Sequence, residues 1–150
     1  MRKIGFIGCG HMAQALIKGL KSNKSYELLG HDRNSKNIAW LKQEKIASYT
    51  LKEVCHKADI LMVCVKPKDM YDLCSEMKTH IGKELKIVSV AAGITLENLK
   101  DALSGGKVYR AMPNIGAKHN LGITSIFSHE ELNEILDIFN YLGKAIVVED

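Results

Sequence analysis

The chain has 150 residues, of which 46% are hydrophobic and 25% are charged, a composition typical of one globular domain with a buried core. Its 21 basic and 17 acidic residues give a net charge of +4 and alternate along the sequence, which suits an anionic ligand but does not indicate nucleic acid. Every apolar run is shorter than the roughly 18 residues of a membrane helix, and the N-terminal segment lacks the features of a signal peptide. The 4 cysteines form no C-x-x-C pair, which predicts reduced thiols. We therefore expect a cytoplasmic protein that binds neither a membrane nor nucleic acid.

Strands and helices are predicted to alternate along the chain. Short apolar runs, typical of parallel strands buried on both faces, predict strands at 3–7, 26–31, 46–48, 59–65, 86–90, 107–112, 122–127 and 145–148. Helical spacing of apolar residues fills the gaps, with Pro67 at a first helical position and apolar residues continuing to Ile81. Residues 128–131 predict a capping box before the last helix. This alternation predicts an α/β fold, a doubly wound and mostly parallel sheet of the Rossmann type, with no domain boundary between residues 1 and 150.

The first predicted strand runs into a glycine-rich turn that opens a helix. Gly8 allows the tight turn, Gly10 lets a pyrophosphate approach the backbone, and the small Ala13 lets the helix pack closely on the strand. The unpaired N–H groups at the helix start then face the anion. The G-x-G-x-x-A pattern also occurs in ordinary turns, so the prediction depends on the strand before it and the helix after it. We assign the pyrophosphate of a dinucleotide to Gly8, Cys9, Gly10, His11, Met12 and Ala13.

The second predicted strand ends in a polar turn about 20 residues past the glycine motif, where Rossmann-type domains read the adenosine ribose. Asp32 can accept a hydrogen bond from the ribose 2′-hydroxyl. Arg33, helped by Asn34 and Ser35, can instead hold a 2′-phosphate. A polar turn that only caps the next helix is the alternative for each residue. Because a bidentate guanidinium outweighs one carboxylate that can rotate away, we expect NADPH to be preferred, with NAD as the alternative coenzyme.

Three further strand ends should lie at the same edge of the sheet and complete the coenzyme site. The first places a lysine at a helix start, the second offers small side chains against which a nicotinamide can lie, and the third ends in an asparagine. A solvated lysine, ordinary close packing and a turn asparagine are the respective alternatives. The residues are Val65, Lys66, Pro67, Ala91, Ala92, Gly93 and Asn114.

The sequence does not identify a catalytic residue. Lys66, Asn114 and Lys118 are placed to reach the crevice, yet no paired acid and base accompanies them. The 6 histidines show no ligand spacing, so we expect no metal site.

Four segments, taken in order and at their spacing, resemble the Δ1-pyrroline-5-carboxylate reductases over nearly the whole chain. They are residues 4–13, 65–67, 89–95 and 110–115. The resemblance implies an NAD(P)H-dependent enzyme of proline biosynthesis that reduces the imine 1-pyrroline-5-carboxylate to L-proline by hydride transfer. One departure is Leu51, which stands where the family often carries an asparagine that helps hold the adenosine end. It leaves the choice between NADPH and NADH open.

The resemblance also bears on domain organisation. It implies a homo-oligomeric enzyme with a C-terminal helical domain, which dimerises and supplies a substrate loop rich in serine and glycine. We therefore expect residues 1–150 to be the NAD(P)-binding domain, to lack that second domain and to be inactive alone. The alternatives are another NAD(P)-dependent reductase with the same domain, acting on hydroxyacids or deazaflavins, and a non-enzymatic module that senses NAD(P).

Overall fold

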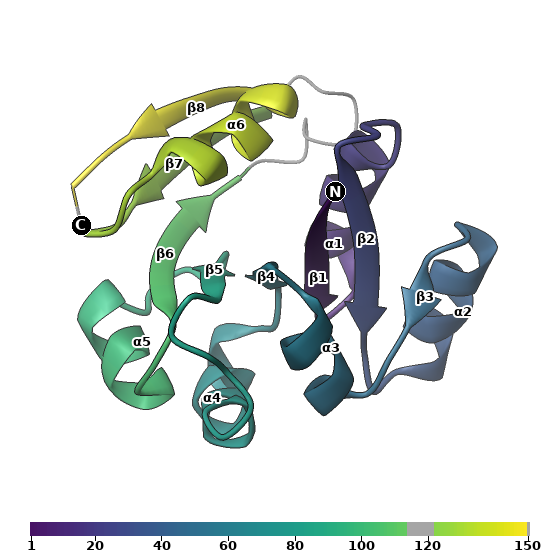
Figure 1. Cartoon of the computed structure of the whole chain (residues 1–150), viewed down its shortest axis with the longest axis horizontal. Helices are drawn as coiled ribbons and strands as arrows, with labels where there is room; N and C mark the ends of the chain where they lie inside the picture. Colours follow the sequence, from purple (N-terminus) through teal and green to yellow (C-terminus); the bar gives the residue numbers. More distant parts are fainter. Residues whose placement is uncertain (114–121, 150) are drawn as a thin grey trace.

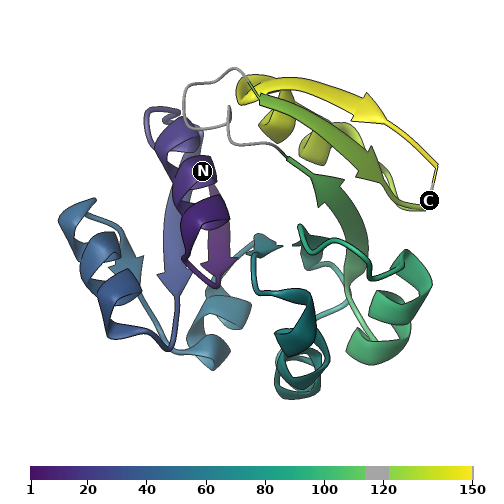
Figure 2. The same cartoon turned by 180° about the vertical axis from the view of Figure 1, so that it is seen from behind.

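The computed structural model describes residues 1–113 and 122–149. Within these residues, eight strands form a single sheet with helices on both faces (Figures 1 and 2). The strands are β1 (Arg2–Ile7), β2 (Tyr26–His31), β3 (Ala47–Ser48), β4 (Ile60–Val63), β5 (Lys86–Ser89), β6 (Lys107–Met112), β7 (Gly122–Phe127) and β8 (Gly143–Val147). The helices are α1 (His11–Leu20), α2 (Ser35–Gln43), α3 (Leu51–Lys57), α4 (Met70–Met77), α5 (Leu96–Leu103) and α6 (Asn133–Tyr141), with a 3-10 helix η1 (Pro67–Asp69) before α4.

The sheet has the order β3-β2-β1-β4-β5-β6-β7-β8. All neighbouring strands are parallel except β6 and β7, which are antiparallel. The chain builds outward from β1 to β3 on one side and from β4 to β8 on the other. The order therefore reverses between β1 and β4, and a ligand crevice is expected beyond the carboxyl ends of these two strands. The predicted mostly parallel, doubly wound α/β fold of the Rossmann type is confirmed.

Alternation of side chains along the strands divides the core into two layers. Ile4 and Phe6 of β1 pack on one face with α1, α2 and α6. Ile7 of β1 packs on the opposite face with α3, α4 and α5. Burial on both faces explains why the strands appear in the sequence as continuous apolar runs. None of the helices in the described part of the chain is long and apolar enough to cross a membrane.

The structure corrects several predicted boundaries, among them that of the last strand, which runs from Gly143 to Val147 rather than over 145–148. Strand β4 ends at Val63 rather than at residue 65, and the helix opened by Pro67 ends at Met77, so Ile81 lies beyond it. The predicted capping box at residues 128–131 is wrong, because α6 begins at Asn133 without a side-chain cap. The Ser128 hydroxyl instead donates to the Val108 carbonyl oxygen (2.6 Å) and accepts from the Glu130 backbone N–H (3.0 Å). It therefore holds the chain against β6.

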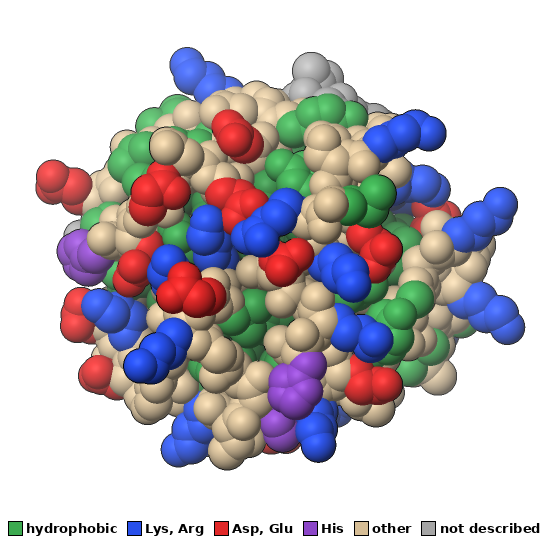
Figure 3. All heavy atoms as spheres, in the orientation of Figure 1, with side chains coloured by type: hydrophobic (Ala, Val, Ile, Leu, Met, Phe, Trp, Pro, Cys, Tyr) green, Lys and Arg blue, Asp and Glu red, His purple; other side chains and the backbone are tan. Residues whose placement is uncertain are grey.

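Charged side chains of both signs are interspersed on the face shown in Figure 3. A network of charged side chains ties the N-terminus to the last helix. Glu134 of α6 accepts from the Arg2 guanidinium (2.6 and 2.7 Å) and from the Lys86 ammonium (2.9 Å). Burial raises the pKa of Glu134, but these bonds outweigh it and the pKa lies below its ordinary value.

Candidate functional site

The glycine turn between β1 and α1 has the geometry predicted for a pyrophosphate loop. Gly8 has a φ of +84°, and a Cβ there would lie 3.0 Å from the Cys64 carbonyl oxygen, so the turn requires glycine. Gly10 is the N-cap of α1, which has no side-chain cap and no acidic residue in its first turn. A Cβ built on Gly10 would meet no atom within 4 Å. The helix start is therefore open to an anionic ligand.

Asp32, at the end of β2, ties this loop to the next one. Its Oδ2 accepts hydrogen bonds from the Cys9 backbone N–H (2.6 Å) and the Asn37 side chain (2.9 Å), and its Oδ1 accepts from the Asn34 backbone N–H (2.8 Å). Burial raises the pKa of Asp32, but these bonds outweigh it, so the pKa lies below its ordinary value. The carboxylate therefore joins the glycine turn to the start of α2.

Replacing Asp32 with asparagine is expected to destabilise the fold by about 1–3 kcal/mol near neutral pH, because backbone donors lose an ionised acceptor. The folded-state pKa is depressed, so the carboxylate stabilises the protein above its unfolded pKa of about 3.9 and loses this effect as the pH falls through the folded value. Thermal unfolding followed by circular dichroism from pH 7 to pH 3 tests this. The difference in melting temperature between wild type and variant should become smaller as the pH falls. A difference in melting temperature that does not change with pH would contradict this prediction. The control is Asp101→Asn, on the exposed face of α5.

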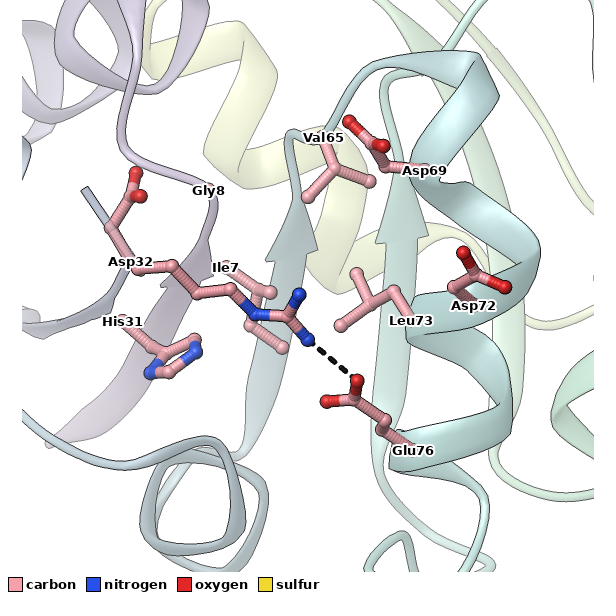
Figure 4. Close-up of a pocket in the computed structure, with 10 residues that line it drawn as sticks. Ile7, Gly8, His31, Asp32, Val65, Asp69, Asp72, Leu73 and Glu76 are labelled. Atoms are coloured by element: carbon pink, nitrogen blue, oxygen red, sulfur yellow. Dashed lines mark hydrogen bonds and ion pairs between the residues drawn. The ribbon is translucent and has the colours of Figure 1, made fainter.

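A cavity of about 290 Å³ lies beside the glycine turn, near the lower end of the range of about 300–1,000 Å³ found for ligand pockets. Figure 4 shows Gly8, His31 and Asp32 on one side of it and residues of η1 and α4 on the other. The His31 Nδ1 lies 2.9 Å from the Tyr49 carbonyl oxygen, so Nδ1 carries the proton in this contact. The lining residues are Ile7, Gly8, His31, Asp32, Arg33, Val65, Asp69, Asp72, Leu73 and Glu76.

An ion pair links the two sides of the cavity. The Arg33 Nη2 atom lies 2.5 Å from the Glu76 Oε1 atom, and Figure 4 marks this contact with a dashed line. The hydrogen bond to Glu76 raises the pKa of Arg33 above its ordinary value. Asp69 and Asp72 also lie on the α4 side, so that wall is acidic whereas Arg33 is basic.

The structure brings together four of the residues predicted from the sequence, namely Gly8, Asp32, Arg33 and Val65, in the lining of this cavity. Asn34 is the N-cap of α2, where its side chain accepts from the Lys36 backbone N–H (2.8 Å). The capping alternative therefore describes the Asn34 side chain in this structure.

The rest of the predicted glycine motif lies around the start of α1. His11 is exposed at the first helical position, Met12 is half-buried, and Ala13 is fully buried beneath the strand. The Cys9 side chain is also buried, and burial with the Asp32 charge raises the pKa of its thiol to about 12. Cys9 therefore offers its backbone rather than a reactive sulfur. Within the described residues, no group of three or more His, Cys, Asp or Glu side chains is arranged to hold a metal ion.

The strand ends predicted to flank the nicotinamide share one edge of the sheet. The Val90 backbone N–H donates to the Val63 carbonyl oxygen (3.1 Å), which joins the ends of β4 and β5. Lys66 is the exposed N-cap of η1, and Pro67 is its first residue. After β5, Ala91 is buried, whereas Ala92 and Gly93 are exposed. The predicted residues Asn114 and Lys118 lie outside the described ranges.

Sequence reasoning missed the α4 wall of the cavity. Asp69, Asp72 and Glu76 are spaced by three and four residues, which places them on one helical face. Such spacing normally indicates a solvated face, but here it follows the end of β4 at Val63, at the edge of the sheet where the fold places its ligands. That combination is the signal that would have found them.

Comparison with known proteins identifies the family. A family model described as "NADP oxidoreductase coenzyme F420-dependent" matches residues 3–93, more than half of the chain. The chain belongs to this family. The pyrroline-5-carboxylate reductase of Escherichia coli is 34% identical over 99% of this chain, which confirms the resemblance found in the sequence. The match covers 60% of that relative, so the chain spans less than two thirds of its length.

Solved structures agree on the fold. A pyrroline-5-carboxylate reductase from Coxiella burnetii superposes with a TM-score of 0.89 and 25% identity, covering 98% of this chain and 58% of that one. A Plasmodium falciparum pyrroline carboxylate reductase, crystallised with NADP bound, gives a TM-score of 0.87 at 22% identity, covering 99% and 58% of the two chains. The second likeness, at its low identity, shows the shared fold alone.

Proposed function

We propose that this chain is the NAD(P)H-binding domain of a pyrroline-5-carboxylate reductase, which reduces 1-pyrroline-5-carboxylate to L-proline. The observation that carries the proposal is the 34% identity to the E. coli reductase over 99% of this chain. The open helix start at Gly10 and the cavity beside Asp32 support it, because a dinucleotide needs both an anion site and an adenosine site.

Each part of the coenzyme has a candidate place on the chain. The α1 start would hold the pyrophosphate, the cavity with Arg33 would hold the adenosine end, and the ends of β4 and β5 would flank the nicotinamide. NADPH supplies the hydride for imine reduction when it is bound. The proposed binding residues among those described are Gly8, Cys9, Gly10, His11, Met12, Ala13, Asp32, Arg33, Asn34, Val65, Lys66, Pro67, Ala91, Ala92 and Gly93.

Titration of the chain with NADPH and NADH tests the proposal. We expect both to bind and NADPH to bind about ten-fold more tightly, because Arg33 adds a charge-assisted contact worth about 1–3 kcal/mol. The Asp32 carboxylate already accepts three hydrogen bonds, so it has less capacity left to accept one from a ribose hydroxyl. Added salt should weaken NADPH binding more than NADH binding. Tighter binding of NADH would overturn the preference, and no binding of either would overturn the proposal.

The matching family description also favours a second candidate, because it names coenzyme F420, a deazaflavin. The same dinucleotide site would then serve hydride exchange between NADP and a deazaflavin. The full-length protein, assayed with 1-pyrroline-5-carboxylate and with oxidised F420, distinguishes the two. Turnover of the imine supports the first proposal, and turnover of F420 alone supports the second.

The wider biology of the enzyme is part of the same proposal. We place it in the cytoplasm, since the 4 cysteines are free thiols in the structure. The full-length enzyme is expected to act on a small imine and to assemble as a homo-oligomer, as the resemblance to the reductases implies.

A further inference from the structure

The Arg33–Glu76 ion pair joins the turn after β2 to helix α4, across the cavity proposed for the adenosine end of the coenzyme. Arg33 follows β2, whereas Glu76 lies 43 residues later in the last turn of α4. Both residues line the same cavity. The pair therefore lies where the 2′-position of an adenosine would enter.

The pair is built to exchange partners rather than to hold the fold. The Arg33 side chain is 75% exposed and the Glu76 side chain is 49% exposed. Exposed ion pairs contribute little to stability, because water and salt screen them. A phosphate dianion offers a guanidinium more charge and a bidentate contact, so it is the stronger partner. The Glu76 carboxylate already holds the Arg33 Nη2 atom, so a 2′-phosphate that binds the guanidinium in a bidentate manner would compete with Glu76 for it.

We propose that Glu76 determines coenzyme specificity by competing with the coenzyme's 2′-phosphate for Arg33. This inference rests on the proposed NAD(P)H-binding function. A coenzyme without the 2′-phosphate leaves the pair in place and is not affected by it. A coenzyme with the 2′-phosphate competes with Glu76 for the guanidinium, and each displaced Glu76 leaves an unpaired carboxylate beside a phosphate. Glu76 therefore lowers the preference for NADPH that Arg33 provides.

The probes that isolate this effect are 2′,5′-ADP and 5′-AMP, because they differ only in the 2′-phosphate. In Glu76→Gln, which keeps the size of the side chain and removes its charge, the affinity for 2′,5′-ADP should rise about three-fold. The affinity for 5′-AMP should stay within experimental error. Asp72→Asn is the matched control, because it removes another carboxylate of the same wall and leaves the Arg33–Glu76 pair intact. Asp72→Asn should raise the affinity for 2′,5′-ADP by less than Glu76→Gln does.

A second background separates competition from a simple repulsion between charges. When Arg33 is replaced by methionine, Glu76→Gln should no longer raise the affinity for 2′,5′-ADP three-fold, since the contested partner is gone. An equal gain in both backgrounds, or no gain in the wild-type background, would overturn the inference. Failure of the wild-type chain to bind NADPH, NADH or either probe would overturn the proposed function itself. Circular dichroism checks that each variant keeps its fold.

Discussion

Replacing Gly10 with valine is expected to weaken NADPH binding by at least about 100-fold while leaving the fold intact. A Cβ at Gly10 meets no protein atom within 4 Å, and its φ of −82° is one that any residue adopts. The branched side chain would instead fill the space through which a pyrophosphate approaches the α1 backbone. Losing two hydrogen bonds to a charged group costs about 3 kcal/mol or more, which corresponds to that factor. Isothermal titration calorimetry measures it.

Gly82→Val provides the control for this substitution. A Cβ at Gly82 also meets no atom within 4 Å, but the residue lies in the segment after α4, outside the cavity lining. Its NADPH affinity should equal that of the wild type. If Gly10→Val bound NADPH as tightly as this control does, with an unchanged circular dichroism spectrum, the pyrophosphate would have to bind elsewhere.

The 150-residue chain alone is expected to bind NADPH yet to reduce 1-pyrroline-5-carboxylate at least about five orders of magnitude more slowly than a full-length reductase. The reason is orientation, because holding two reactants in attack geometry contributes on the order of 7 kcal/mol. The match covers only 60% of the E. coli relative, and the resemblance places the substrate loop in the other part of the enzyme.

Steady-state oxidation of NADPH, followed at saturating imine, tests this prediction. The E. coli reductase serves as the reference, and NADPH binding to the isolated chain confirms that its coenzyme site is formed. Turnover comparable to that of the reference would show that residues 1–150 contain the substrate site. Lys66 would then be the first described residue to replace, since it is an exposed cap beside the crevice.

The strands were predictable because their sequence pattern follows directly from burial. Ile60 to Val63 is buried on both faces of the sheet, so it appears as an uninterrupted apolar run. The glycine turn was equally predictable, because the φ of Gly8 excludes other residues. Ser128 was not, because its hydroxyl bonds to β6 as well as to a local N–H, and the sequence does not show which partner a serine finds.

The contact of Arg33 with the far wall of the cavity could not be predicted, for a different reason. Arg33 and Glu76 meet only after α4 has packed on the sheet, and a contact across 43 residues leaves no local pattern. The prediction of the role of Asp32 was also incomplete. Its position predicted a ribose contact, but only the structure shows that the carboxylate already accepts the Cys9 and Asn34 backbone N–H groups.

That carboxylate has a consequence for redesigning coenzyme choice. Because Asp32 bonds to Cys9 in one loop and to Asn34 in the next, any exchange at this position would alter the pyrophosphate and ribose subsites together. Asn34 is similarly committed, as the cap of α2. In the described contacts, the side chains of Arg33 and Glu76 pair with each other and not with the backbone. An engineer seeking to switch this scaffold between NADPH and NADH would therefore alter Arg33 and Glu76, and leave Asp32 to hold both loops in place.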